Sequence, residues 1–367
     1  MAFPNPVRRA SGVALSRGEL TGAVGDSVTV LPIVVALAAT TELGLGATLL
    51  WFGVFQIVWG LRYGLPMSVE PMKALAGLAI AGGLTYAEFA TAGLVAGGVL
   101  LALGATGAVE RVRRYVGEPV VRGVQLAVAL VLLETAVGLS AGAPVTAGAG
   151  LAVAAVVAVA GRPRAAALAV LAVGGAVAVG ATGVPTATVP AVAPLDPASL
   201  SPTAGALEGA AAQLAMTVGN AAVATSLLCA DLFDADVSAD DLATGMGAMT
   251  LTAVPLGGCP MCHGSGGLAG KHAFGARTGG ANLLVGVGYL GAALVAAGAL
   301  LSAFPMALLG VLLALVALQL VRAAAATDRR WLTALVGVLG LLANVGVAFV
   351  GGAALHVALS RRDGESS

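Results

Sequence analysis

The sequence is poor in charge, aromatic residues and cysteine. Of its 367 residues, 10% are charged and 4% are aromatic, and three are cysteines. A soluble domain carries about 25% charged residues, so this chain cannot cover a water-exposed surface. Three cysteines make no disulfide framework, and a formal net charge of zero without a basic stripe argues against a nucleic-acid partner.

Apolar residues take the place of the missing charge. They make up 59% of the chain, and the mean hydropathy is +0.98. Apolar runs of about 17–25 residues recur from Val28 to Leu359, each long enough to cross a bilayer as a helix. They lack the period-two alternation of a barrel strand. Residues 1–20 hold three arginines and no apolar core, so no cleavable signal peptide is expected. The sequence therefore predicts an all-α integral membrane protein and not an enzyme.

The pattern predicts fourteen spans, or twelve if the weakest pair is re-entrant. Those of the first half are 24–41, 43–61, 66–82, 87–104, 119–139, 145–160 and 165–182. A proline-rich loop, Pro185 to Pro202, follows. Those of the second half are 207–229, 242–254, 259–268, 281–301, 305–321 and the long stretch 331–359, which Asn344 and Gly346 would split into two.

Basic residues favour an even number of spans with both ends inside. Lys and Arg gather on cytoplasmic loops, and here they fall on alternate loops, apart from Lys73. They lie in the N-terminus, at Arg62, at Arg111, Arg113, Arg114 and Arg122, at Arg162 and Arg164, at Lys271 and Arg277, at Arg322, Arg329 and Arg330, and at the C-terminal end. An Asp-rich loop (Asp231, Asp234, Asp236, Asp240, Asp241) is compatible with the same side. Both termini are expected in the cytoplasm and the proline-rich loop outside the cell.

Two halves of seven spans each would have opposite orientations, because seven is odd. In each half the third element is short and interrupted by proline or glycine. Paired broken segments at matching positions are the best sequence pointer to a transporter's binding site.

The first broken element is 64–74. Pro66 and Pro71 forbid a continuous helix, and Pro71 suits the first residue of a new one. A half-helix starting there would aim free N–H groups and its positive dipole end at a cavity. Lys73 in its first turn would either help attract an anion or only neutralise Glu70.

The second broken element is 255–270, where dense glycines bring backbone N–H groups close to a ligand. Its alternative is a small-residue helix contact, which leaves His263 and two prolines unexplained. Within it, Cys259-Pro-Met-Cys262-His263 matches a haem-attachment pattern and offers three zinc ligands without a fourth. Cysteine as a small packing residue is the preferred interpretation, and neither a cofactor nor a metal is expected.

Polar residues also mark the first and eighth spans. Gln213, Thr217 and Asn220 share one helical face, where they would line a cavity or only join helices. Asp26 and Thr29 lie near the start of the first span. Asp26 and Glu70 are also candidates for a coupling proton.

These residues carry a resemblance to the molybdate transporter family within the sulfate permease superfamily. The matching stretches are 25–26, 31–37, 71–74, 213–225, 260–269 and 274–279. The resemblance implies a seven-plus-seven inverted repeat with a core domain, a gate domain and two broken helices. It implies the boundaries 1–23 (cytoplasmic N-terminus), 24–182 (first repeat, core 24–104 and gate 119–182), 183–206 (extracellular loop), 207–359 (second repeat, core 207–301 and gate 305–359) and 360–367 (cytoplasmic tail).

The resemblance places substrate between the third and tenth elements. The candidate substrate-binding residues are Asp26, Thr29, Glu70, Met72, Lys73, Gln213, Thr217, Asn220, Met261, Cys262, His263, Gly264, Ser265 and Gly266. The family usually has glutamine where this chain has Glu70, and a carboxylate beside an oxyanion is unfavourable unless it is protonated or paired.

The function expected is alternating-access transport of molybdate across the plasma membrane. The alternatives are transport of tungstate, sulfate or another small oxyanion, and a membrane redox protein that uses Cys259, Cys262 and His263. The partners expected are the oxyanion, the lipid bilayer and, for assembly as a homodimer, a second copy of the chain.

Overall fold

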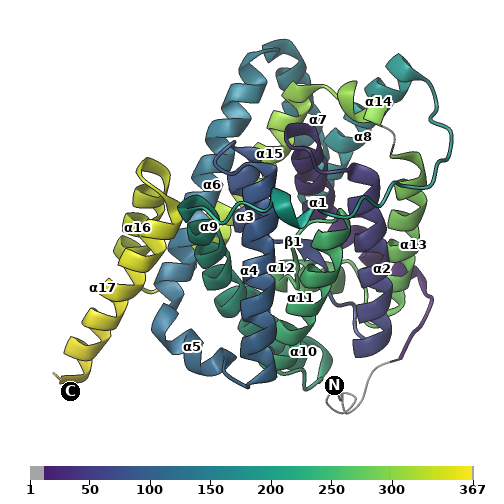
Figure 1. Cartoon of the computed structure of the whole chain (residues 1–367). Helices are drawn as coiled ribbons and strands as arrows, with labels where there is room; N and C mark the ends of the chain where they lie inside the picture. Colours follow the sequence, from purple (N-terminus) through teal and green to yellow (C-terminus); the bar gives the residue numbers. More distant parts are fainter. Residues whose placement is uncertain (1–11, 297, 366–367) are drawn as a thin grey trace.

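A computed structural model describes residues 12–296 and 298–365 of the chain. The described chain is built from helices, many of which run along one common direction (Figure 1). Its two strands are two residues long and pair with each other deep inside the bundle.

The first half begins with the following main elements. They are α1 (Arg17–Thr40), α2 (Leu45–Tyr63), β1 (Glu70–Pro71), α3 (Lys73–Ile80), α4 (Tyr86–Ala105), α5 (Val109–Val116), α6 (Glu118–Ala141), α7 (Pro144–Val159) and α8 (Ala166–Thr182).

The second half repeats this plan. Its main elements are α9 (Ala204–Met216), the π-helical η3 (Thr217–Ala224), α10 (Thr225–Phe233), α11 (Ala239–Ala253), β2 (Met261–Cys262), α12 (Ser265–Ala273), α13 (Gly280–Val295), α14 (Gly298–Ser302), α15 (Met306–Ala324), α16 (Arg330–Leu342) and α17 (Val345–Glu365).

Seven helices of the described chain are long and apolar enough to cross a membrane. They start at Arg17, Leu45, Tyr86, Glu118, Pro163, Ala204 and Met306. Four apolar helices are shorter, at 144–159, 280–295, 330–342 and 345–361. The remaining predicted spans, 66–82, 242–254 and 259–268, have α3, α11 and α12 as helical counterparts. Several of these helices are shorter than the hydrocarbon core requires of a straight helix.

Helix packing is symmetric between the two halves. The packing of α2 against α13 corresponds to that of α11 against α4 when the halves are exchanged. In the same way, α1 against α12 corresponds to α9 against α3, and α1 against α8 corresponds to α9 against α17. This exchange symmetry is what an inverted repeat produces.

The helices sort into two groups. The core group is α1–α4 with α9–α13, and the gate group is α6–α8 with α15–α17. Within the gate group α6 lies along α15 and α16, and within the core group α2 lies along α13 and α4 along α11.

The proline-rich loop crosses the outside of the core group as an extended strap (teal in Figure 1). Thr188 N–H donates to the Leu294 carbonyl at 2.7 Å, and Leu195 N–H donates to that of Pro255 at 2.8 Å. Thr203 Oγ1 donates to Glu88 at 2.6 Å, in the first turn of α4. The strap therefore lies at the end of the molecule where α4 begins.

The opposite end carries the short helix α5, which follows the last turn of α4. Asp240 accepts from the Val109 amide at the start of α5, and the neighbouring Asp241 binds Arg62 at 2.7 Å. Hydropathy gives no sign of α5, because its residues are polar on one face and too few to span.

Several predicted boundaries are wrong. Helix α1 begins at Arg17 instead of Val24, because Ser16 caps it and Glu19 accepts from three amides at 277–281. Residues 17–23 thus belong to the first helix and not to an N-terminal segment. Helix α17 likewise continues past Leu359, so that the predicted tail is helical as far as Glu365.

The eleventh span, predicted as one helix over 281–301, is divided. Helix α13 ends at Val295, and α14 starts at Gly298 and packs against α8. The chain leaves the core group for the gate group here, and a change of direction is invisible to hydropathy. The split of 331–359 is confirmed: Asn344 Oδ1 accepts from the Gly346 amide at 2.7 Å at the start of α17.

The expected Asp-rich loop is mostly helical. Asp231 lies in α10, and Asp240 and Asp241 lie in the first turn of α11. Acidic side chains stabilise a helix N-terminus through its dipole. Lys271, expected in a basic loop, is instead fully buried in the last turn of α12.

Candidate substrate site

Two half-helices begin next to each other inside the bundle. Strands β1 and β2 pair antiparallel, with Glu70 opposite Cys262 and Pro71 opposite Met261. Helix α3 leaves β1 at Lys73, and α12 leaves β2 at Ser265. The two predicted discontinuities are therefore present, and α3 starts two residues after Pro71.

The strand pair is held from behind by side chains of the core group. Thr250 Oγ1 donates to the Met261 carbonyl at 2.9 Å and accepts from its amide at 3.1 Å. Gln56 Nε2 donates to the Val69 carbonyl at 3.3 Å. Such bonds satisfy backbone groups that have neither water nor a longer sheet available.

His263 belongs to this support. Its Nδ1 lies 2.9 Å from the Ser68 carbonyl, to which it donates a hydrogen bond. Its ring packs edge-on against Trp59 and Tyr63, with centroids 5.4 Å and 5.9 Å away. The fully buried side chain points away from the half-helix ends and fixes the backbone that precedes one of them.

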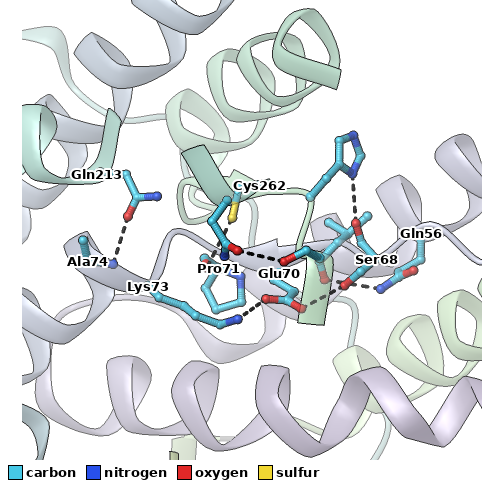
Figure 2. A network of polar contacts seen from close by, with 12 residues as sticks. Gln56, Ser68, Glu70, Pro71, Lys73, Ala74, Gln213 and Cys262 are labelled. Carbon is cyan, nitrogen blue, oxygen red and sulfur yellow. Dashed lines mark hydrogen bonds and ion pairs between the residues drawn. The ribbon is translucent and has the colours of Figure 1, made fainter. Parts of the chain in front are cut away.

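Gln213 caps the first half-helix. Its Oε1 accepts from the amides of Ala74 at 2.9 Å and Leu75 at 3.3 Å, as Figure 2 shows for Ala74. Its Nε2 donates to Thr217 Oγ1 at 2.8 Å. The expectation that the first-turn amides of α3 face a cavity is therefore wrong for Ala74 and Leu75, because α9 delivers a side-chain acceptor to them.

Glu70 of β1 and Lys73, the first residue of α3, form an ion pair. The Lys73 ammonium reaches back to Glu70 Oε2, and Ser68 Oγ donates to Oε1 at 3.1 Å (Figure 2). Glu70 is 1% exposed and Lys73 is 19% exposed. The carboxylate is thus compensated on both oxygens, whereas the ammonium keeps one side toward open space.

That open space is a cavity of about 470 Å³ between the two groups of helices. The core group contributes Thr29, Glu70, Lys73, Met216, Asn220, Ala224, Leu227, Leu228, Ser265, Gly266 and Gly267. The gate group contributes Arg122, Gln125, Val316, Gln319, Leu320 and Ala323. A ligand here would touch both groups at once.

The cavity gathers part of the predicted site. Thr29, Glu70, Lys73, Asn220, Ser265 and Gly266 line it. Met72, Gln213, Thr217, Met261, Cys262, His263 and Gly264 lie behind the lining. The side chain of Asp26 lies outside the described residues.

The eighth span is not the regular α-helix that was expected. Its middle, η3, is π-helical, and a π turn widens the helix and often marks a functional site. Asn220 lies in this turn and accepts from Ser265 Oγ at 2.9 Å. The widened turn brings an amide side chain to the N-terminal end of α12, where Ser265, Gly266 and Gly267 form the first turn.

Sequence reasoning missed the contribution of the gate helices. Arg122 was counted only as a basic loop residue, and Gln125 and Gln319 were overlooked. Polar residues inside otherwise apolar helices mark cavities in membrane proteins. Gln125 and Gln319, each embedded in an apolar run, carried that signal.

A second cavity leads outward from the first. Its volume is about 500 Å³, and it shares Arg122, Asn220, Ala224 and Leu227 with the inner one. It runs past Gly117 and Glu118 to Glu110 and Arg113 of α5. The inner cavity is thus reached from the end of the molecule that carries α5, opposite the strap.

The cysteine-histidine stretch does not gather a ligand set. Cys259 and Cys262 are buried, and Cys262 Sγ lies 3.8 Å from the Pro71 carbonyl while His263 turns toward Ser68. Within the described residues no three Cys, His, Asp or Glu side chains come together as metal ligands. Cys262 lies in β2 and His263 follows it, so that both side chains contact the segment 68–71 on the other side of the strand pair.

Comparison with known proteins adds family information. Residues 18–132 and 205–320 match the family described as "Molybdate transporter of MFS superfamily". The two matched stretches cover equivalent parts of the halves, from the first helix of each into α6 and α15.

Individual relatives cover most of the chain. Molybdate transporter 1 of Arabidopsis thaliana is 30% identical, over 94% of this chain and 88% of the relative. Molybdate transporter 2 of the same plant is 31% identical, over 83% and 78%. Molybdate transporter 1 of Chlamydomonas reinhardtii is 28% identical, over 96% and 93%.

Solved structures show the same fold. The transmembrane domain of the cyanobacterial bicarbonate transporter BicA superposes with a TM-score of 0.65 at 18% identity, covering 92% of this chain and 97% of that one. The murine anion transporter Slc26a9 in its inward-facing state gives 0.70 at 14% identity, covering 94% and 68%. The chain therefore has the core-and-gate inverted-repeat fold.

Proposed function

Because this chain belongs to the molybdate transporter family, we propose that it carries molybdate across the membrane by alternating access. The observation that carries the proposal is the cavity between the core and gate groups. A half-helix from each repeat begins at its wall, and it is reached from one end of the molecule.

The cavity has the chemistry that a small dianion requires. An ion that leaves water must exchange its hydration shell for converging donors. The first-turn amides of α12 have no acceptor within their own helix, and their positive dipole end favours an anion. Thr29, Asn220 and Ser265 add polar side chains, and Lys73 adds an ammonium face.

The volume allows an anion that keeps part of its water. One water molecule occupies about 30 Å³ in the liquid, so about 470 Å³ holds a tetrahedral oxyanion with several waters. Donors close to the half-helix ends would bind the oxyanion on one side, and the water molecules on its other side would remain free to exchange.

Alternating access would result from movement of the gate group against the core group. The half-helix ends and their support belong to the core group, and the outer wall of the cavity belongs to the gate group. The proposed domains keep the boundaries 24–104 with 207–301 for the core and 119–182 with 305–359 for the gate, apart from the corrected helix ends. Sliding of one group past the other would close the present opening and form one beside the strap.

The proposed orientation places both termini and α5 in the cytoplasm of a cell whose plasma membrane holds the protein. Arg62 and the basic helix α5 lie at one end, joined by Asp240 and Asp241, and the strap, which has no Lys or Arg, lies at the other. Basic residues favour the cytoplasmic side. The cavity would then be open to the cytoplasm, and a homodimer is the assembly proposed.

Binding to the purified full-length protein tests the substrate. Calorimetric titrations with molybdate, tungstate and sulfate are compared at one ionic strength. We expect molybdate and tungstate to bind and sulfate to bind more weakly. Uptake of labelled molybdate into proteoliposomes tests transport. Binding of sulfate alone would assign the protein to the neighbouring substrate class, and binding of none would refute the proposal.

A further inference from the structure

Three charged side chains line the inner cavity, and two of them cancel. They are Glu70, Lys73 and Arg122. The Lys73 ammonium is paired with the buried Glu70 carboxylate, so that these two charges cancel on the core side of the cavity. Arg122, on the gate helix α6, is the remaining cation among the described side chains of this lining, and its positive charge would attract a dianion.

The contacts of Arg122 are weak ones. Its Nε and Nη2 both reach the same oxygen of Glu118, at 3.4 Å and 3.3 Å, and Nη1 reaches Gln125 Oε1 at 3.2 Å. The Glu118 side chain is 56% exposed. Solvent-exposed pairs of i,i+4 spacing contribute little, so this pair is easier to separate than the buried one.

Glu118 loses little when it releases the arginine. It is the first residue of α6, where the helix dipole stabilises a carboxylate by itself. The guanidinium, by contrast, gains from an oxyanion, because its planar fork presents parallel N–H donors to two oxygens at once.

We propose that Arg122 is a substrate-binding residue presented by the gate, and that the bound oxyanion takes it over from Glu118. The inference deepens the function proposed above and rests on it. Glu118 holds the arginine at the mouth shared by the two cavities while the site is empty. On binding, the anion lies between Arg122 of the gate group and the α12 N-terminus of the core group, and so contacts both of the groups that move relative to each other.

The experiment compares four variants of the full-length protein. Arg122→Gln removes the charge, Arg122→Lys keeps the charge without the fork, and Glu118→Gln removes the competitor. Arg113→Gln is the matched control, because Arg113 forms a similar exposed pair with Glu110 at 2.8 Å and lines only the outer cavity. Molybdate affinity is measured by calorimetry at one salt concentration, and folding by the apparent unfolding temperature in detergent.

The expected order of affinities separates the effect of the Arg122 charge from that of its planar guanidinium and from that of the competing Glu118 carboxylate. Arg122→Gln should weaken molybdate binding by roughly tenfold or more, and Arg122→Lys by a smaller factor. Glu118→Gln should tighten binding by about threefold, and Arg113→Gln should stay within about twofold of the parent. If Arg122→Gln lowers the apparent unfolding temperature, the affinities of Arg122→Lys and Glu118→Gln for molybdate test the proposal instead.

Two outcomes overturn the inference. One is a folded Arg122→Gln protein with the parent's affinity, and the other is a Glu118→Gln protein that binds more weakly. Failure of the substrate assignment looks different: the parent would bind tungstate or sulfate and not molybdate, and the variants would keep the same order with that anion. If the parent binds no oxyanion, both proposals fail.

Discussion

At the scale of single residues, Lys271 is the charge most completely removed from water. Its ammonium donates to Gln56 Oε1 at 2.9 Å, Asn282 Oδ1 at 2.9 Å and the Met67 carbonyl at 3.1 Å. Three acceptors match the three hydrogens of an ammonium. The side chain ties α12 to α2, to α13 and to the segment before β1, and its place in the last turn of α12 also suits the helix dipole.

We expect Lys271→Met to destabilise the protein, because Gln56 Oε1 and Asn282 Oδ1 lose the ammonium donor and the Met67 carbonyl keeps only its bond from Asn282 Nδ2. Each unsatisfied buried group costs about 1–3 kcal/mol, so the apparent unfolding temperature in detergent should fall by several degrees. Arg322→Met, which removes an exposed cation from the last turn of α15, is the control and should change it little. An unchanged unfolding temperature for Lys271→Met would show that these bonds contribute nothing.

The Glu70–Lys73 pair gives a second prediction. Lys73→Ala should weaken molybdate binding by roughly tenfold or more, about 1.4 kcal/mol, because it leaves a carboxylate unpaired beside the anion. Glu70→Gln should preserve or improve binding, since it removes a like charge. The double variant Lys73→Met/Glu70→Gln should bind within about threefold of the parent, because the pair is neutral as a unit.

Calorimetry on the three variants and uptake into proteoliposomes check this. If Glu70→Gln binds molybdate but no longer concentrates it, Glu70 carries the coupling proton. If Lys73→Ala binds as the parent does, Lys73 is structural, and its assignment to the site is wrong.

At the scale of elements, two glycines at the start of α12 have different roles: Gly264 supports the strand pair, and Gly266 lines the cavity. A methyl group on Gly264 would overlap the Glu70 carboxylate, whereas one on Gly266 would meet nothing within 4 Å. Gly264, the N-cap of α12, lies against the Glu70 side chain of β1, and Gly266 faces the cavity.

Gly264→Ala should therefore lower stability, and Gly266→Ala should leave stability unchanged and weaken molybdate binding. Overpacking a tight site costs about 1–3 kcal/mol, which the unfolding temperature in detergent will register for the first variant alone. Calorimetry then measures the affinity of Gly266→Ala for molybdate. Parent-like binding by Gly266→Ala would place the anion away from the α12 N-terminus.

At the scale of the whole molecule, the strap and α5 mark opposite ends. Single cysteines are placed at Ala198 in the strap and at Glu110 in α5, both of which are exposed. A membrane-impermeant maleimide added to intact cells should label Ala198→Cys, and Glu110→Cys should react only after the membrane is opened. The native cysteines are buried in the described structure, so the parent provides the background. Labelling in the reverse pattern would invert the proposed orientation.

The sequence alone determined the membrane class and the two breaks. Hydropathy reports how long a segment stays apolar, and proline or dense glycine reports where a helix cannot continue; both are local properties of the chain. The positions of Pro71 and of the glycines around His263 therefore predicted half-helices that the structure contains.

Only the tertiary structure decided which polar groups face the cavity. The spacing of Gln213, Thr217 and Asn220 places all three on one helical face. In the structure, however, Gln213 caps α3, and Asn220 reaches the cavity through a π turn. Arg122 and Gln319 come from helices far apart in the chain and meet only because the gate packs against the core. Whether a buried polar side chain binds substrate or satisfies a neighbouring backbone depends on the partner that packing places beside it, and no local pattern in a sequence contains that partner.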